Sequence, residues 1–120
     1  MATILLVEDT PANQALAAKL LEAAGHRVLS AVTAEAGIAL AREQLPDLVL
    51  LDLGLPDMSG WDALSAIRAD DRAAGLRVIA FTAHAMVGDR ERALAAGFDG
   101  YLSKPIEYAT FVDSVAGYLA

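Results

Sequence analysis

Residues 3–11 read Thr-Ile-Leu-Leu-Val-Glu-Asp-Thr-Pro, and this stretch holds the pattern that decides the fold. Thr3–Val7 is a continuous apolar run, which is typical of a strand covered on both faces of a sheet. Thr10 and Pro11 then suit the N-cap and first residue of a helix, which we expect to end at Gly25. The stretch therefore predicts a strand and a helix, with Glu8 and Asp9 between them.

The same alternation continues to the end of the chain. We expect further strands over residues 27–31, 48–51, 77–81 and 100–102, each followed by a helix, with helix starts at Thr33, at Ser59 and near Gly88. Five strand–helix units in a row predict an α/β fold, with a parallel sheet and helices on both faces. A doubly wound five-stranded sheet commonly has the strand order 2-1-3-4-5, and its ligand crevice lies at the carboxyl ends of strands one and three.

Composition excludes several classes of protein. The chain has 120 residues, 56% of them hydrophobic, which predicts one domain with a substantial core. A net charge of −7 argues against a nucleic-acid-binding surface, and the absence of cysteine excludes disulfides and thiol chemistry. Asp52 interrupts the longest apolar run, so we expect no membrane span and a soluble cytoplasmic protein.

Polar side chains follow four of the five predicted strands. Glu8 and Asp9 follow the first strand, Asp52 ends the third, Thr82 ends the fourth and Lys104 follows the fifth. Three carboxylates in one crevice repel one another unless a cation joins them, and Mg²⁺ prefers such oxygen ligands. An ammonium group and a hydroxyl group nearby would complete a pocket for a phosphoryl group.

Each of these residues also has an ordinary structural explanation. An acidic pair before a helix commonly serves as an N-cap, and a lysine before a proline is ordinarily a solvated loop residue. The functional interpretation depends on the joint pattern, in which all of these side chains follow the strands of one architecture.

Five spaced motifs resemble those of the receiver domain of two-component response regulators. They are Val7-Glu8-Asp9, Leu50-Leu51-Asp52, the following Leu55-Pro56 with Ser59-Gly60, Phe81-Thr82-Ala83, and Tyr101-Leu102-Ser103-Lys104-Pro105. The resemblance covers essentially all of residues 1–120. It implies a flavodoxin-like fold and a single receiver domain without an output domain, similar to stand-alone regulators and to receivers of hybrid kinases.

The resemblance also implies a role for each acidic residue. Asp52 would accept a phosphoryl group from a histidine kinase or a histidine phosphotransfer protein. Asp9, Asp52 and the backbone carbonyl of Gly54 would bind Mg²⁺, while Glu8 would act mainly through water or by its charge. The domain would promote its own phosphorylation and dephosphorylation, without being a metabolic enzyme.

Signalling would then depend on residues that sense the phosphoryl group. Thr82 and Lys104 would bind its oxygens, and Tyr101 would be the aromatic switch that changes a surface for a downstream protein. Possible contacts on that surface are Arg90, Glu91, Arg92, Tyr108 and Phe111, although Phe111 could instead belong to the core. His84, two residues after Thr82, could overhang the pocket, and Trp61 is expected to pack at the start of the third helix.

Two alternative functions use the same residues. A small Mg²⁺-dependent phosphohydrolase of the haloacid-dehalogenase type would carry a second aspartate two residues after the nucleophile, where this chain has Gly54. A degenerate receiver that serves only as a binding module would lose an acidic, threonine or lysine position, and this chain retains all of them. Both alternatives are therefore less well supported than a receiver that is phosphorylated.

Overall fold

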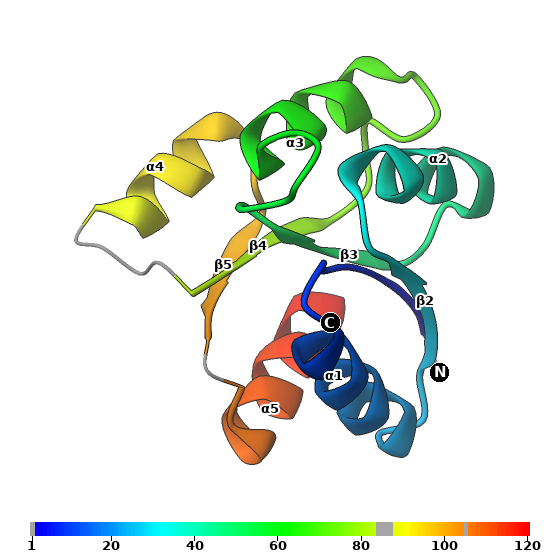
Figure 1. Ribbon diagram of the computed structural model, residues 1–120, viewed down its shortest axis with the longest axis vertical. Coiled ribbons are helices and arrows are strands. Elements are labelled where there is room, and N and C mark those ends of the chain that lie inside the picture. Colours follow the sequence, from blue (N-terminus) through cyan, green and yellow to red (C-terminus); the bar gives the residue numbers. More distant parts are fainter. Residues whose placement is uncertain (1, 84–87, 105) are drawn as a thin grey trace.

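The computed structural model describes residues 2–83, 88–104 and 106–120, apart from the side chain of Tyr108. Strands and helices alternate along the chain as predicted (Figure 1). Their order is β1 (Thr3–Val7), α1 (Pro11–Ala23), β2 (Arg27–Ala31), α2 (Ala34–Gln44), β3 (Leu48–Asp52), α3 (Gly60–Ala69), β4 (Val78–Thr82), α4 (Asp89–Ala96), β5 (Gly100–Ser103) and α5 (Tyr108–Leu119). The strands form a five-stranded parallel sheet in the order β2-β1-β3-β4-β5, which confirms the predicted topology.

Helices cover both faces of the sheet. In Figure 1, α1 and α5 lie against one face, and α2, α3 and α4 lie against the other. Alternate residues of one strand therefore enter different cores: Ile4 and Leu6 pack with the α1 and α5 residues, whereas Leu5 and Val7 pack on the opposite side. Burial on both faces explains why β1 is apolar at every position. Within the described ranges, no helix has the length and apolar character needed to cross a membrane.

Side-chain caps mark the starts of α2 and α3. The hydroxyl of Thr33 accepts a hydrogen bond from the Ala36 N–H at 3.2 Å, and that of Ser59 accepts one from the Asp62 N–H at 3.1 Å. Both predicted helix starts are thereby confirmed. Thr10 occupies the N-cap position of α1, but its side chain makes no capping hydrogen bond.

Some predicted boundaries are wrong by one residue. β4 runs from Val78 to Thr82 rather than over residues 77–81, and β5 continues through Ser103. Both strands extend further because Thr82 is paired with Ser103. The carbonyl of Thr82 also accepts a hydrogen bond from the backbone N–H of Lys104, the residue after Ser103, at 2.8 Å. Thr82 and Lys104 still lie at the carboxyl ends of their strands, as expected.

The start of α3 lies directly against the backbone of β3. A Cβ at Gly60 would lie 2.5 Å from the carbonyl oxygen of Asp52 and 2.6 Å from the Cα of Leu53. We therefore expect Gly60→Ala to lower the free energy of unfolding by roughly 1–3 kcal/mol, because rigid backbone must shift to admit the methyl group. Urea denaturation would measure this change.

Gly117, in α5, provides a matched control. A Cβ at this position would meet nothing within 4 Å, so Gly117→Ala should raise the free energy of unfolding by roughly 0.5–1 kcal/mol through helix propensity. An unchanged free energy of unfolding in Gly60→Ala would contradict the close approach of α3 to the end of β3.

Candidate phosphorylation site

Three carboxylates meet where β1 and β3 end. Val7 is paired with Leu51 across these neighbouring strands, so the residues that follow, Glu8 and Asp52, lie side by side. Glu8, Asp9 and Asp52 each offer a carboxylate oxygen, and these oxygens all lie within 4.8 Å of one another. Glu8 and Asp52 are buried, while Asp9 is half-buried. The structure thus brings together the three acids that the sequence predicted for the crevice.

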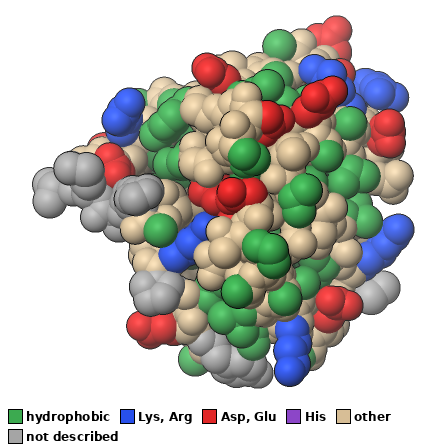
Figure 2. All heavy atoms as spheres, viewed as in Figure 1, with side chains coloured by type: hydrophobic (Ala, Val, Ile, Leu, Met, Phe, Trp, Pro, Cys, Tyr) green, Lys and Arg blue, Asp and Glu red, His purple; other side chains and the backbone are tan. Residues whose placement is uncertain are grey.

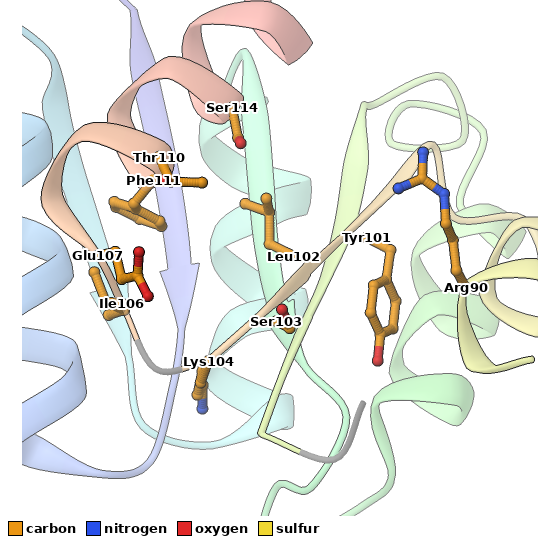
Figure 3. A pocket seen from close by; sticks show the side chains of 10 residues that line it. All are labelled: Arg90, Tyr101, Leu102, Ser103, Lys104, Ile106, Glu107, Thr110, Phe111 and Ser114. Atoms are coloured by element: carbon orange, nitrogen blue, oxygen red, sulfur yellow. The ribbon is translucent and has the colours of Figure 1, made fainter. Parts of the chain in front are cut away.

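The ammonium group of Lys104 lies between two of these acids. Its Nζ donates to a carboxylate oxygen of Glu8 and, at 3.2 Å, to Oδ2 of Asp52. The Lys104 side chain is only 8% exposed, so this ion pair is largely shielded from solvent. Lys104 is held there because its backbone N–H is bonded to the end of β4. In Figure 3 its ammonium group lies beyond the carboxyl end of β5.

The pKa of the Glu8 carboxyl is affected in opposite directions by its surroundings. Burial raises the pKa of the Glu8 carboxyl above its ordinary value, the ion pair with Lys104 lowers it, and the nearby Asp52 raises it again. The net direction is upward. The ion pair with Lys104 favours the charged form of the buried Glu8 carboxyl against the effect of burial.

Gly54 lies beside Asp52 in the loop of residues 53–59, which we call the β3–α3 loop. Its N–H donates to Oδ1 of Asp52 at 3.0 Å, and the residue forms a β-bridge with Ser59. The missing side chain leaves space, since a Cβ would approach the Asp52 carboxylate no closer than 4.0 Å. That the carbonyl of Gly54 binds a metal stays a prediction.

The predicted switch residues are Thr82, at the carboxyl end of β4, and Tyr101, within β5. Thr82 is buried, with 2% of its surface exposed, and Tyr101 is half-buried. Burial raises the pKa of the Tyr101 hydroxyl above its ordinary value, and the charge of Asp89 acts in the same direction. A cavity of about 330 Å³ lies beside β5, and Tyr101 and Lys104 both line it (Figure 3).

The remaining candidates are in different environments. Phe111 belongs to the core, 4% exposed and 5.7 Å from the ring of Phe81 between centroids, although one side of it reaches the cavity. Arg90, Glu91 and Arg92 are exposed on α4, and Arg92 lies over the ring of Trp61 at the start of α3. His84, Pro105 and the side chain of Tyr108 lie outside the described residues.

One polar contact near the site was missed by sequence reasoning. Asp57, in the β3–α3 loop, accepts hydrogen bonds from the backbone N–H groups of Ala34 and Glu35 at the start of α2. An aspartate after a proline in a loop is typical of a turn, and no local pattern indicates a partner on another helix.

The acidic cluster fits a hard divalent cation. Its donors are carboxylate oxygens at the carboxyl ends of two adjacent strands, close enough together to share one ion, and Mg²⁺ is bound through such oxygens and water. The ammonium of Lys104 already demonstrates that a positive charge is accommodated against Asp52. In the view of Figure 2, acidic and basic side chains lie beside each other near the middle of the molecule.

Known proteins are similar to this chain in sequence and fold. The sequence matches the response regulator receiver domain over residues 4–116. It is 38% identical over 117 residues to the polar-differentiation response regulator DivK of Brucella anthropi, covering 98% of this chain and 95% of that protein.

Solved structures of receiver domains have the same fold as this chain. The receiver domain of a sensor histidine kinase from Pseudomonas aeruginosa, which has a magnesium ion in its active-site cleft, superposes with a TM-score of 0.89 at 36% identity, covering 98% of this chain and 97% of that one. The receiver domain of a putative LuxO repressor from Vibrio parahaemolyticus has a TM-score of 0.89 at 32% identity, covering 98% and 89%. The chain belongs to the response regulator receiver domain family of two-component signalling.

Proposed function

We propose that this protein accepts a phosphoryl group on Asp52 in a Mg²⁺-dependent reaction and works as a signalling switch. The observation that carries the proposal is the cluster of Glu8, Asp9 and Asp52 with the ammonium of Lys104 against it. Asp9, Asp52 and the carbonyl of Gly54 would hold the metal, and Glu8 would contribute mainly its charge. Bound Mg²⁺ would neutralise charge on the phosphoryl oxygens.

The chemistry requires one bond to form and one to break. A carboxylate oxygen of Asp52 attacks phosphorus, and the bond from phosphorus to the donor breaks, which leaves an acyl phosphate on the protein. The donor would be a phosphohistidine of a kinase or phosphotransfer protein, whose imidazole departs. Lys104 and Thr82 lie at neighbouring strand ends and are suited to binding the oxygens of the transferred phosphoryl group. Such contacts would stabilise the negative charge on these oxygens in the transition state.

The alternatives are less compatible with the site. A phosphohydrolase of the type considered would place a second carboxylate two residues after Asp52, and Gly54 has no side chain there. A binding module without phosphorylation would not require a buried Glu8 beside Lys104 at the same crevice, since burying charges is costly. The downstream partner, the kinase and the cytoplasmic location stay predictions.

Amide NMR with Mg²⁺ and beryllofluoride, a mimic of the phosphoryl group, would test the switch. We expect shifts at Asp52 and Thr82 that extend to Tyr101 and α4, because a ligand bound at Thr82 changes the packing beside Tyr101. The coupling available is modest, about 1–3 kcal/mol or roughly a 5–150-fold change in partner affinity, so some active-like molecules should exist beforehand.

Two other results would have distinct meanings. Shifts confined to the residues around Asp52 would eliminate the switch and leave a phosphate-accepting domain without a changed surface. No shifts with Mg²⁺ and beryllofluoride together would contradict the proposed site itself. Beryllofluoride without Mg²⁺ is the matched control, and it should leave the spectrum unchanged.

A further inference from the structure

Backbone hydrogen bonds hold the β3–α3 loop close to the end of β3. Gly60 N–H donates to the carbonyl of Leu53 at 2.9 Å, and the bridge between Gly54 and Ser59 closes the loop one step further out. The loop begins immediately after Asp52 and returns to the same strand end. Its shape therefore determines where Gly54 lies relative to the Asp52 carboxylate.

The far side of this loop is attached to a different element. Asp57 accepts hydrogen bonds from the N–H of Ala34 at 2.8 Å, through Oδ1, and from the N–H of Glu35 at 3.0 Å, through Oδ2. Both donors belong to the first turn of α2, whose N–H groups have no partners within the helix. These two hydrogen bonds hold the pKa of the Asp57 carboxyl below its ordinary value, as expected for a carboxylate at the positive end of a helix dipole.

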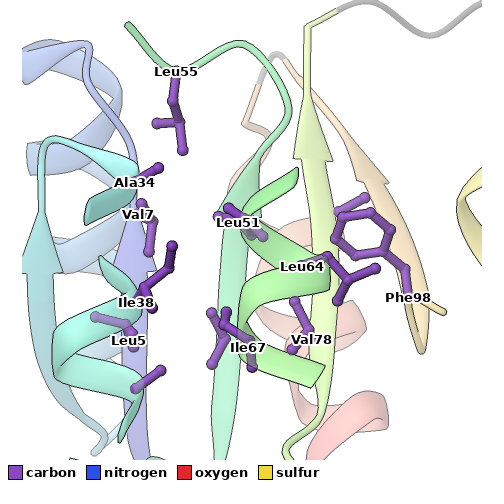
Figure 4. Packing of buried hydrophobic residues seen from close by; sticks show 14 of the residues in the cluster. Leu5, Val7, Ala34, Ile38, Leu51, Leu55, Leu64, Ile67, Val78 and Phe98 are labelled. Atoms are coloured by element: carbon purple, nitrogen blue, oxygen red, sulfur yellow. The ribbon is translucent and has the colours of Figure 1, made fainter. Parts of the chain in front are cut away.

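A second contact from the same loop reinforces this attachment. The side chain of Leu55 is buried in the core that includes Ala34 and Val7. Figure 4 shows Leu55 directed from the loop toward Ala34 at the start of α2. The loop is thus attached to α2 by the bidentate Asp57 carboxylate, and its Leu55 packs into the core to which Ala34 belongs.

Helix α2 does not require Asp57 simply to begin. Thr33 already caps it, accepting a hydrogen bond from the Ala36 N–H, and Glu35 places a negative charge in its first turn. What Asp57 adds is a connection between the start of α2 and the loop that contains Gly54, across 22 and 23 residues of sequence.

We propose that Asp57 is a positioning residue of the phosphorylation site, which connects the β3–α3 loop to α2 and so holds Gly54 in place beside Asp52. This inference rests on the proposed function. Only two residues separate Gly54 from Asp57, and the loop between them is anchored at Leu55, so a displacement at one end reaches the other. Because coupling between two sites is reciprocal, binding at Asp52 should in turn affect the start of α2.

Calorimetric titration of the whole protein with Mg²⁺ would test the first half of this proposal. We expect Asp57→Ala to weaken Mg²⁺ binding roughly tenfold, at the lower end of the range for losing a group that orients a metal ligand. Asp57→Asn should have an intermediate effect, because its amide oxygen can still accept one of the two hydrogen bonds.

Thr33→Ala is the matched control. It removes the other cap of α2, which costs about 1 kcal/mol of stability, but leaves the loop attached to the helix. We expect it to lower the urea midpoint comparably to Asp57→Ala while leaving the Mg²⁺ affinity unchanged. Equal weakening of Mg²⁺ binding by both variants would mean that a destabilised α2 is responsible, and the proposal would be wrong.

Amide NMR of the wild-type protein tests whether binding at Asp52 affects the start of α2. Saturation with Mg²⁺ should shift the Ala34 and Glu35 amide resonances, and in Asp57→Asn these shifts should shrink. Unchanged Ala34 and Glu35 resonances in the wild type would overturn the proposal even if Asp57→Ala fails to fold. A wild-type protein that binds no Mg²⁺ would instead remove the proposed function, whereas normal wild-type binding with an unaffected Asp57→Ala removes only this inference.

Discussion

Asp52→Asn is expected to abolish phosphorylation of the protein. With acetyl phosphate and Mg²⁺, the wild type should gain the mass of one phosphate, as a carboxylate oxygen of Asp52 displaces acetate from phosphorus. The amide of asparagine is a much poorer nucleophile, yet it preserves an acceptor for the Gly54 N–H that bonds to Oδ1 of Asp52. The variant should therefore fold normally and remain unlabelled in intact-mass spectrometry.

The control for this experiment is an aspartate outside the site. Asp113 is exposed on α5, and Asp113→Asn should be labelled to the same extent as the wild type. Omission of Mg²⁺ should prevent labelling of both proteins. Equal labelling of Asp52→Asn and the wild type would show that the acceptor lies elsewhere.

Asp9→Ala is expected to weaken Mg²⁺ binding by at least roughly tenfold, since losing a direct ligand should cost no less than losing a group that orients one. Asp9 is the half-buried member of the acidic cluster, and its carboxylate is not among those that the Lys104 ammonium contacts. Fluorescence of Trp61, at the start of α3 and edge-on to Phe98, would provide the titration signal. Undiminished affinity would place the metal at another position.

Lys104→Ala should separate metal binding from phosphoryl transfer. Its ammonium occupies the acidic cluster, so its loss should leave Mg²⁺ affinity equal to or higher than that of the wild type. Phosphorylation should nevertheless slow on the order of 100-fold, as when one charge-stabilising donor is removed from an active site. Weak Mg²⁺ binding together with fast phosphorylation would reverse the roles assigned to Asp9 and Lys104.

Much of the fold could be predicted because its signals are local. A strand that is buried on both faces has to be apolar at nearly every position, as β1 and β3 are, and the starts of α2 and α3 are marked by the capping residues Thr33 and Ser59. Alternating strands and helices leave few topologies, since parallel strands are joined by right-handed crossovers. The acidic cluster followed from the same rule, because parallel strands that are neighbours present their carboxyl ends at one edge.

The sequence by itself thus determined the topology, the starts of α2 and α3 and the identity of the acids in the crevice. Only the tertiary structure decided that Lys104 pairs with Glu8, 96 residues away, and that Asp57 holds the start of α2. It also placed Phe111 in the core, where the amphipathic spacing of α5 left both positions open. The physical reason is that propensity and periodicity record what each residue meets within a few positions along the chain, whereas these contacts exist only after the sheet has brought distant strand ends together.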